Sequence, residues 1–328
     1  MSVIYHPSFS NSETRPVQPA IPKTLSVVIC SRGHAQDLRK CLAALHVQTQ
    51  KVDEIIVIDF MSQSMEIEEI CRNANVKYAR DRVAGIDQAR NMGAAAARSD
   101  VVAYLDEGGL PRADWAKQIL CAFDRPGIAA VAGNVRPIAL DTFAEILFNR
   151  YWAQANEPFE RDYSQSDFLG SGHNTFPAWE VGSGANMAFR RSSFARFGLF
   201  DPALALDDGH FSGESEYLYR ILGQGGACRY TPDAVIWRRY LDTEAALKPV
   251  LRSQIRGHVA SLRIQAQRFP GRGNWRRVLI TLPACFLRRG VSRLRWGRDH
   301  KNWFLLTELH GYFAGLFCSI GRKRTRIN

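Results

Sequence analysis

Three polar turns each follow directly on an apolar run, and their side chains are the first candidates for chemistry in this sequence. The run "DVVAYLDE" ends in Asp106 and Glu107, "DEIIVID" ends in Asp59, and "LSVVIC" is followed by Ser31 and Arg32. Adjacent carboxylates repel each other unless a cation or a sugar hydroxyl lies between them. The pattern favours a site for a cation or a polar sugar ligand, although a single carboxylate at a strand end is more often only a cap for the next helix or turn.

The elements that must position these turns alternate between strands and helices. Short apolar runs rich in β-branched residues are typical of buried strands, and apolar residues three and four apart are typical of helices. The order predicted is strand 25–30, helix 35–48, strand 53–59, helix 64–74, strand 76–80, helix 86–98, strand 100–106, helix 113–123 and strand 128–135. This alternation predicts βαβ units, right-handed crossovers and a mostly parallel sheet. Because ligands bind beyond the carboxyl ends of such strands, we expect Asp59 and Asp106 to line one pocket.

The regular alternation of strands and helices ends near residue 140. Residues 141–180 contain aromatic residues, proline and glycine, with one helix predicted near 142–153. A strand over 184–191, a helix over 214–226 and an extended segment over 227–237 follow. These later segments are expected to complete the sheet and the site.

Five stretches, in this order, resemble the family-2 glycosyltransferases of the GT-A fold. They are "LSVVICSRGHAQDLRKCLAAL", "DEIIVID", "VAGIDQARNMGAAAARSDVVAYLDE", "GSGANMAFRRSSFARFGLFDPAL" and "GESEYLYRILGQGGACRYTPDAVIW". The resemblance covers roughly residues 24–240, about two thirds of the chain. It implies a Rossmann-like α/β fold, with a mostly parallel central sheet flanked by helices, and a nucleotide-sugar-dependent, inverting sugar transferase.

The resemblance also implies roles for particular residues. Nucleotide-sugar contacts are expected from Ser31, Arg32, Asp59, Asp87, Arg90, Asn91, Asp106, Gly184, Ala185 and Asn186. Asp106 and Glu107 match the first two members of the family's Asp-Asp-Asp turn, which implies that they hold Mg²⁺ or Mn²⁺. A departing nucleoside diphosphate gathers negative charge that a divalent cation or a cationic side chain must stabilise. Inversion in one displacement also needs a carboxylate that takes the acceptor's proton.

Three positions depart from the family pattern. The third acidic residue of the turn is Gly108, the usual catalytic Asp of the Gly-Gly-Glu-Asp segment is Ser215 in "SGES", and the late His after "AVIW" is Arg238. Losing one carboxylate is expected to weaken the metal site, because ligand charge tunes metal affinity.

Two interpretations follow from these departures. In the first, the site has been re-equipped: Glu107 holds the metal or Arg238 replaces its charge on the diphosphate, and another residue serves as base. In the second, the site has decayed, and the chain is a non-catalytic scaffold that binds a nucleotide sugar or another transferase. The candidate bases are Glu214 and Glu216, with Asp207, Asp208 and His210 as further candidates. Both glutamates have a simpler explanation, because acidic residues oppose the positive end of a helix dipole behind an N-cap such as Ser212.

The positive charge of the chain belongs to its C-terminal quarter. The net charge is +11 overall, whereas residues 249–328 carry 17 Lys and Arg against 2 acidic residues. Segment 274–296 places apolar residues among six arginines, and segment 302–320 is strongly apolar. This pattern favours helices that lie on an anionic membrane surface; a helical cap on the catalytic domain is the alternative. Nucleic acid is not expected as a partner, because no nucleic-acid-binding motif accompanies the charge.

The remaining features set the domain organisation and the location. We predict a polar tail over 1–23 that is not a secretory signal, a GT-A domain over 24–245, and a basic amphipathic helical extension over 246–328. No run of 18 uncharged apolar residues predicts a spanning helix. Seven scattered cysteines without a CxxC pair indicate a reducing compartment. Together these features suggest a peripheral enzyme on the cytoplasmic face of the cell membrane, with a lipid-linked or glycan acceptor and a role in cell-surface polysaccharide or glycolipid synthesis.

Overall fold

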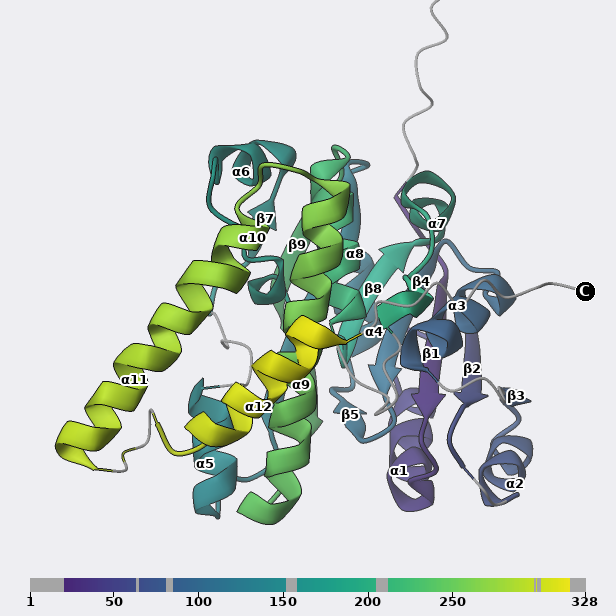
Figure 1. Cartoon of the computed structure of the whole chain (residues 1–328). Coiled ribbons are helices and arrows are strands. Elements are labelled where there is room, and N and C mark those ends of the chain that lie inside the picture. Colours follow the sequence, from purple (N-terminus) through teal and green to yellow (C-terminus); the bar gives the residue numbers. More distant parts are fainter. Residues whose placement is uncertain are drawn as a thin grey trace, which may run out of the picture.

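The computed structural model describes residues 21–62, 65–80, 85–151, 158–204, 212–297, 299 and 302–318. Within these residues the chain forms one mixed sheet with helices on both faces and a group of helices that follows it (Figure 1). Three of the candidate bases, Asp207, Asp208 and His210, lie outside the described residues.

The first part of the sheet is parallel, as the sequence predicted. Strands β1 (Leu25–Ser31), β2 (Glu54–Asp59), β3 (Lys77–Arg80) and β4 (Val101–Asp106) lie in the order β3-β2-β1-β4. The connecting helices are α1 (Ala35–His46), α2 (Glu66–Asn73) and α3 (Ile86–Ala96). The inner strands are mostly apolar, because helices cover both faces of the sheet.

The second part of the sheet mixes directions. Strand β8 (Asn186–Arg190) runs antiparallel between β4 and β6 (Ile128–Pro137), and the long β9 (Ala227–Arg238) runs parallel to β6. Two three-residue strands, β5 (Gly109–Pro111) and β7 (Arg161–Tyr163), pair antiparallel with β9. The pairing of β5 sets Gly109 beside Arg238, so the turn after β4 lies against the end of β9. The sequence pattern did not predict β5 or β7, because three residues are too few to show a periodicity.

Further helices complete the two layers. They are α4 (Trp115–Cys121), α5 (Phe143–Tyr151), α6 (Gln165–Gly170), α7 (Arg191–Phe197) and α8 (Gly213–Gly223), with short 3₁₀ turns η1 (Ala178–Glu180) and η2 (Pro202–Leu204). One apolar core lies between the sheet and helices α1, α2 and α4, around Trp115 and Leu38. The other lies between the sheet and helices α3, α6 and α8, around Phe189 and Tyr217. The sheet is thereby held rigidly between two layers, and its strand ends are fixed in space.

The C-terminal quarter is helical, as expected. It comprises α9 (Glu244–Arg268), α10 (Asn274–Arg276), a π-helical turn η3 (Arg277–Thr281), α11 (Leu282–Trp296) and α12 (Leu305–Phe317). Helix α12 packs closely along α9, because a Cβ atom at Gly311 or Gly315 would lie 2.4 or 2.6 Å from a backbone oxygen of α9. Helix α11 extends away from the rest of the molecule (Figure 1). Among the described residues, every helix is too short or too polar to cross a bilayer.

Pro283 lies in the first turn of α11 rather than in a kinked helix interior. The π turn of η3 comes immediately before it. Proline has no N–H to donate, so its place at the start of a helix, next to a π turn, avoids breaking a regular α-helical ladder. The helix type therefore changes from π to α directly before this proline.

Candidate functional site

A cleft of about 920 Å³ lies at the carboxyl ends of β1, β4 and β9. Its lining includes eight of the residues predicted to bind the donor, hold a metal or act as base, namely Arg32, Arg90, Asp106, Glu107, Gly184, Ala185, Glu214 and Arg238. The position agrees with the rule that ligands of parallel sheets bind beyond the strand ends. The cleft is therefore the candidate site.

Asp59 does not line this cleft, and the expectation that Asp59 and Asp106 share one pocket is wrong. Both residues end a parallel strand, but Asp59 pairs in register with Ser31, whereas Asp106 pairs with Cys30. Successive side chains of a strand point to opposite faces, so the two aspartates face opposite sides of the sheet. Asp59 is fully buried and accepts hydrogen bonds from the Ser62 backbone and hydroxyl and from the Tyr78 hydroxyl. Its contact with a nucleotide stays a prediction.

The Glu107 carboxylate stabilises the turn between β1 and α1. The Ser31 hydroxyl donates to Oε2 at 2.6 Å, the Arg32 backbone N–H donates to Oε1 at 3.0 Å, and His34 Nδ1 lies 2.6 Å from Oε1. Glu107 is also buried. Both of its oxygens are therefore used by protein groups, which leaves little capacity for a metal ion.

Asp106 forms an ion pair with Arg238 across the rim of the cleft. The Nε atom of Arg238 lies 2.8 Å from Oδ2 of Asp106, and the two side chains are 41% and 28% exposed. Gly109, which is three residues after Asp106 and lies in β5, pairs with Arg238 in the sheet. A Cβ atom at Gly108 would meet only Asp37 Oδ2, at 3.8 Å, so the space on the ligand side of this turn is open. Burial lowers the pKa of nearby Arg32, and the charge of Asp106 opposes that shift.

Arg90, which also lines the cleft, joins two carboxylates from different elements. Its Nη1 atom donates to Asp87 Oδ1 at 2.8 Å and to Glu214 Oε2 at 3.1 Å. Burial raises the pKa of Asp87 to about 6, although Arg90 counteracts that shift. Burial lowers the pKa of Arg90, but the charges of Glu214 and Asp87 outweigh it and raise that pKa overall, so Arg90 stays charged. Glu214 in the cleft is thus held by the buried, permanently charged guanidinium of Arg90.

Two glycines permit this cluster to close. A Cβ atom at Gly213 would lie 2.0 Å from Asp87 Oδ2, and one at Gly184 would lie 2.5 Å from Arg90 Nη2. The residue before Gly213, Ser212, has φ of 96°, which is costly for a residue with a side chain. Ser212 occupies the N-cap position of α8, but its side chain makes no capping hydrogen bond.

Several predicted residues lie outside the cleft lining. Asn91 exchanges two hydrogen bonds with the backbone of Phe200, and Asn186 bonds to Trp115 and to two backbone carbonyls. Glu216 is buried in ion pairs with Arg220 and Arg268. The side chains of Asn91, Asn186 and Glu216 therefore connect secondary-structure elements. Of the two glutamates proposed as base, only Glu214 is in the cleft lining. Ser31 and Asp87 do not line the cleft, but each forms a hydrogen bond with a residue that does: Ser31 with Glu107, and Asp87 with Arg90.

Three residues that the sequence analysis missed also line the cleft. Trp179, His258 and Arg277 come from η1, α9 and η3, and the Arg277 guanidinium lies 4.1 Å from the Trp179 ring centroid. Burial, together with Arg277, lowers the pKa of His258 to about 3, so this histidine is neutral. These residues belong to no motif and are far apart in the chain.

The described residues do not fit a conventional divalent-metal site. They include no group of three or more His, Cys, Asp or Glu side chains arranged to hold a metal ion. Mg²⁺ and Mn²⁺ sites need several oxygen ligands, whereas Asp106 pairs with Arg238 and Glu107 accepts three protein contacts. We therefore derive no chemical step from a bound metal.

Comparison with known proteins identifies the family. The family model "Glycosyl transferase family 2" matches residues 26–198, more than half of the chain. The chain belongs to glycosyl transferase family 2.

Two relatives illustrate how far the similarity extends. The pre-mycofactocin glycosyltransferase of Mycobacterium tuberculosis is 24% identical over 233 residues, which is 68% of this chain and 44% of the relative. The glycosyltransferase AglE of Haloferax volcanii is 29% identical over 119 residues, which is 34% of this chain and 39% of AglE. The chain thus matches less than half the length of either relative.

Solved structures agree on the fold. The mannosyltransferase PcManGT from Pyrobaculum calidifontis, solved in complex with GDP-Man and Mn²⁺, superimposes with a TM-score of 0.58 at 15% identity, covering 93% of this chain and 90% of PcManGT. Residues 1–349 of TarS from S. aureus give a TM-score of 0.51 at 13% identity, covering 89% of this chain and 72% of TarS. The fold expected from the sequence, a GT-A arrangement, is confirmed.

Proposed function

We propose that this chain is an inverting glycosyltransferase that moves a sugar from a nucleotide-sugar donor to a lipid-linked or glycan acceptor. The observation that carries the proposal is the cleft itself, because its lining includes both Arg238, at the end of β9, and Glu214, in the first turn of α8. A cation suits the departing diphosphate, and a carboxylate suits the acceptor's proton. Family membership and the nucleotide sugar bound by PcManGT support the same reaction class.

In the donor half of the mechanism, Arg238 takes the place of a metal ion. Its guanidinium is positioned by Asp106 and is partly exposed, so it can turn from the carboxylate to a diphosphate oxygen. Arginine binds phosphate with a planar fork of donors and needs no deprotonated ligands of its own. Arg32, on the neighbouring turn, adds a second positive charge to the cleft. A divalent cation, Mg²⁺ or Mn²⁺, contributes little in this mechanism.

In the acceptor half, Glu214 is the general base. Arg90 fixes the carboxylate through Oε2 at 3.1 Å and leaves Oε1 to accept the proton of an acceptor hydroxyl. Proton transfer by a positioned carboxylate typically contributes about 10²- to 10⁴-fold to a rate. The attack and the departure of the diphosphate then occur on opposite sides of the sugar, which inverts its configuration.

The test is a panel of nucleotide sugars, each incubated with the full-length protein in EDTA and in Mn²⁺ and assayed for hydrolysis or transfer. The proposal expects at least one donor to be consumed in EDTA. Binding of nucleoside diphosphates without any turnover in either condition would refute it and favour the non-catalytic scaffold.

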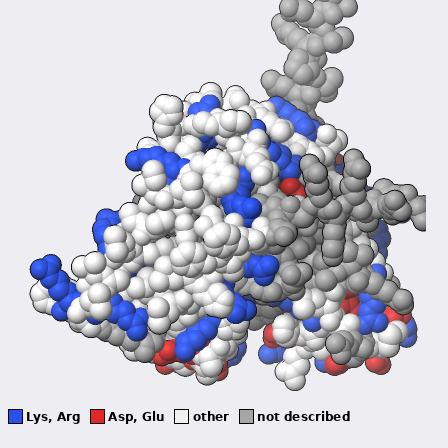
Figure 2. Space-filling view, viewed as in Figure 1, with Lys and Arg blue, Asp and Glu red and all other residues white. Residues whose placement is uncertain are grey.

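We also propose that the C-terminal helices attach the protein to the cytoplasmic face of the cell membrane, where cell-surface polysaccharide or glycolipid is assembled. Helix α11 carries four arginines and no acidic residue, and Leu287 and Leu294 are exposed on it. Figure 2 shows the face with α11 and α12, where basic side chains are scattered over uncharged surface and acidic ones are few. Apolar anchors among arginines are typical of helices that lie in an anionic interface.

Vesicle sedimentation tests the attachment. The protein should bind phosphatidylglycerol-containing vesicles at low salt, and Leu287→Ser combined with Leu294→Ser should weaken that binding. Leu169→Ser, an exposed leucine on α6, is the matched control and should bind as the wild type does. Equal binding by all three proteins would exclude α11 as the anchor.

A further inference from the structure

One buried cation serves two carboxylates at the candidate site. The Nη1 atom of Arg90 lies 2.8 Å from Asp87 Oδ1 and 3.1 Å from Glu214 Oε2. The side chains of Asp87, Arg90 and Glu214 are 2%, 4% and 13% exposed. Because Arg90 carries one positive charge, the three groups together keep one negative charge when both carboxylates are ionised. Asp87 and Glu214, the carboxylate pair, therefore compete for the same guanidinium.

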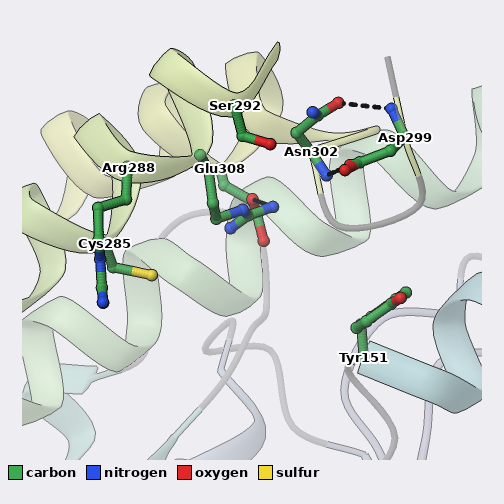
Figure 3. Close-up of a pocket in the computed structure, with 8 residues that line it drawn as sticks. Tyr151, Cys285, Arg288, Ser292, Asp299, Asn302 and Glu308 are labelled. Carbon is green, nitrogen blue, oxygen red and sulfur yellow. Dashed lines mark hydrogen bonds and ion pairs between the residues drawn. The ribbon is translucent and has the colours of Figure 1, made fainter. Parts of the chain in front are cut away.

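The carboxylates of a second cavity each have a partner of their own. That cavity, of about 550 Å³, lies between the end of α5 and helices α11 and α12, and its lining holds two arginines and two carboxylates (Figure 3). Glu308 Oε2 lies 2.5 Å from Arg289 Nη2, and Asp299 accepts a hydrogen bond from the Asn302 backbone N–H at 2.9 Å. The shared guanidinium of the carboxylate pair is thus a distinct arrangement, and it lies at the residue assigned as general base.

The charges that act on Asp87 come from α3 and α8. Burial raises the pKa of Asp87 to about 6; Arg90 opposes this rise, and Glu214 and Glu216 add to it. Like charges at close range disfavour each other's ionisation. The charge of Asp87 consequently depends on its neighbours in a range of pH near neutrality.

The other titratable groups beside the carboxylate pair are neutral or already paired. Burial raises the pKa of the Cys30 thiol, on β1, to about 12, and it raises the pKa of the Tyr104 hydroxyl, on β4, well above its usual value. Both groups are therefore neutral near pH 7. Glu216 is paired with Arg220 and Arg268. Within the described part of the chain, the competition between the two carboxylates thus centres on one arginine.

We infer that Asp87 is a positioning residue for the general base, because its negative charge competes for Arg90 and thereby strengthens Glu214 as a proton acceptor. When Asp87 is protonated or replaced by a neutral residue, Arg90 is left to Glu214 alone, which then holds a proton less tightly. A weaker proton acceptor is a poorer general base near neutral pH. The inference rests on the proposed function, because it adds a positioning residue to the base assigned there.

Carboxyl ¹³C NMR of the full-length protein, without donor or acceptor, tests the inference. With glutamate labelled at its side-chain carboxyl carbon, the Glu214 signal is the one that Glu214→Gln removes. The titration midpoint of this signal should move to lower pH by about one unit in Asp87→Asn. Asp114→Asn is the matched control and should leave the midpoint unchanged, because Asp114 pairs with Arg112 outside the cleft.

Equal midpoints in the wild type and Asp87→Asn would overturn the inference. If such a variant also melted at a lower temperature, Asp87 would only hold Arg90 in place. The wild type decides the question if Asp87→Asn fails to fold, because coupled carboxylates titrate in two steps. A Glu214 signal with two inflections would then support the inference, and a signal with one inflection would overturn it.

Failure of the proposed function is distinguishable from failure of this inference. The acid limb of the transfer rate should move to lower pH in Asp87→Asn, in step with the NMR midpoint. A shifted midpoint in a protein that consumes no nucleotide sugar would support the competition for Arg90 and refute the transferase. Transfer of a sugar, with equal Glu214 midpoints in the wild type and Asp87→Asn, would support the transferase and overturn the role of Asp87.

Discussion

Replacing Arg238 with alanine should weaken nucleoside diphosphate binding while the fold stays intact. The pair with Asp106 measures 2.8 Å, but its side chains are 41% and 28% exposed. Solvent screens such pairs, so the loss in free energy of unfolding should be below about 1 kcal/mol. A charge-assisted hydrogen bond to phosphate is worth about 1.5–3 kcal/mol, which corresponds to about 10- to 100-fold in Kd.

Isothermal titration of UDP and GDP, each in EDTA and in Mn²⁺, measures this effect. The wild type should bind one of them in EDTA, and Arg238→Ala should raise that Kd by the factor above. Arg112→Ala is the matched control, because Arg112 forms a similarly exposed pair with Asp114 outside the cleft. Asp106→Ala should also weaken binding, because it removes the group that positions Arg238.

Two results would refute the reasoning. Loss of all binding in EDTA, together with unchanged binding by Arg238→Ala in Mn²⁺, would show that a metal rather than the arginine neutralises the diphosphate. Equal losses in Arg238→Ala and Arg112→Ala would show that only the overall charge of the protein matters.

Three further predictions address the remaining parts of the site. Glu214→Gln should lower the transfer rate by at least about 10²-fold with little change in diphosphate binding. Glu216→Gln should instead mainly lower the melting temperature, because it breaks buried ion pairs. Similar transfer rates in both variants would exclude Glu214 as base. Gly213→Ala should lower the free energy of unfolding by about 1–3 kcal/mol in a denaturant titration. Gly170→Ala should leave it unchanged, because its Cβ atom would meet no atom within 4 Å. Equal stabilities of the two variants would show that a Cβ atom at Gly213 does not clash with Asp87. Because the pKa of His258 is lowered to about 3, the unfolded chain binds a proton that the native protein does not as the pH falls below about 6.5. This group's contribution to stability should be complete near pH 7 and should fall by up to about 2 kcal/mol at pH 5, so that His258→Gln loses less stability over that range. Parallel pH profiles of the two proteins would be inconsistent with a histidine that is neutral in the native protein.

The fold was largely predictable, because its signals are local. The four parallel strands are runs of buried β-branched residues, and their helices have apolar faces of the expected period. Strands β5 and β7 are strands only because they pair with β9. The local sequence pattern does not show such long-range pairing.

The site was predictable at the level of motifs but not of side-chain direction. Asp59 and Asp106 both end apolar runs, and only the register of β1 with its neighbours shows that they face opposite sides of the sheet. Glu214 and Glu216 are two residues apart on one helix, so they point away from each other, and the sequence could not say which one faces the cleft. His258 and Arg277 reach the cleft through packing of the C-terminal helices, which depends on contacts far apart in the chain.

The central claim is that the cleft binds a nucleoside diphosphate through arginine rather than through a metal. The most direct measurement is a crystal structure of the full-length protein with UDP or GDP, whichever binds, grown in EDTA. The account predicts that the diphosphate lies in the cleft with an oxygen bonded to the Arg238 guanidinium. A diphosphate bound away from Arg238, or one that enters the crystal only when Mn²⁺ bridges it to Asp106, would contradict the account.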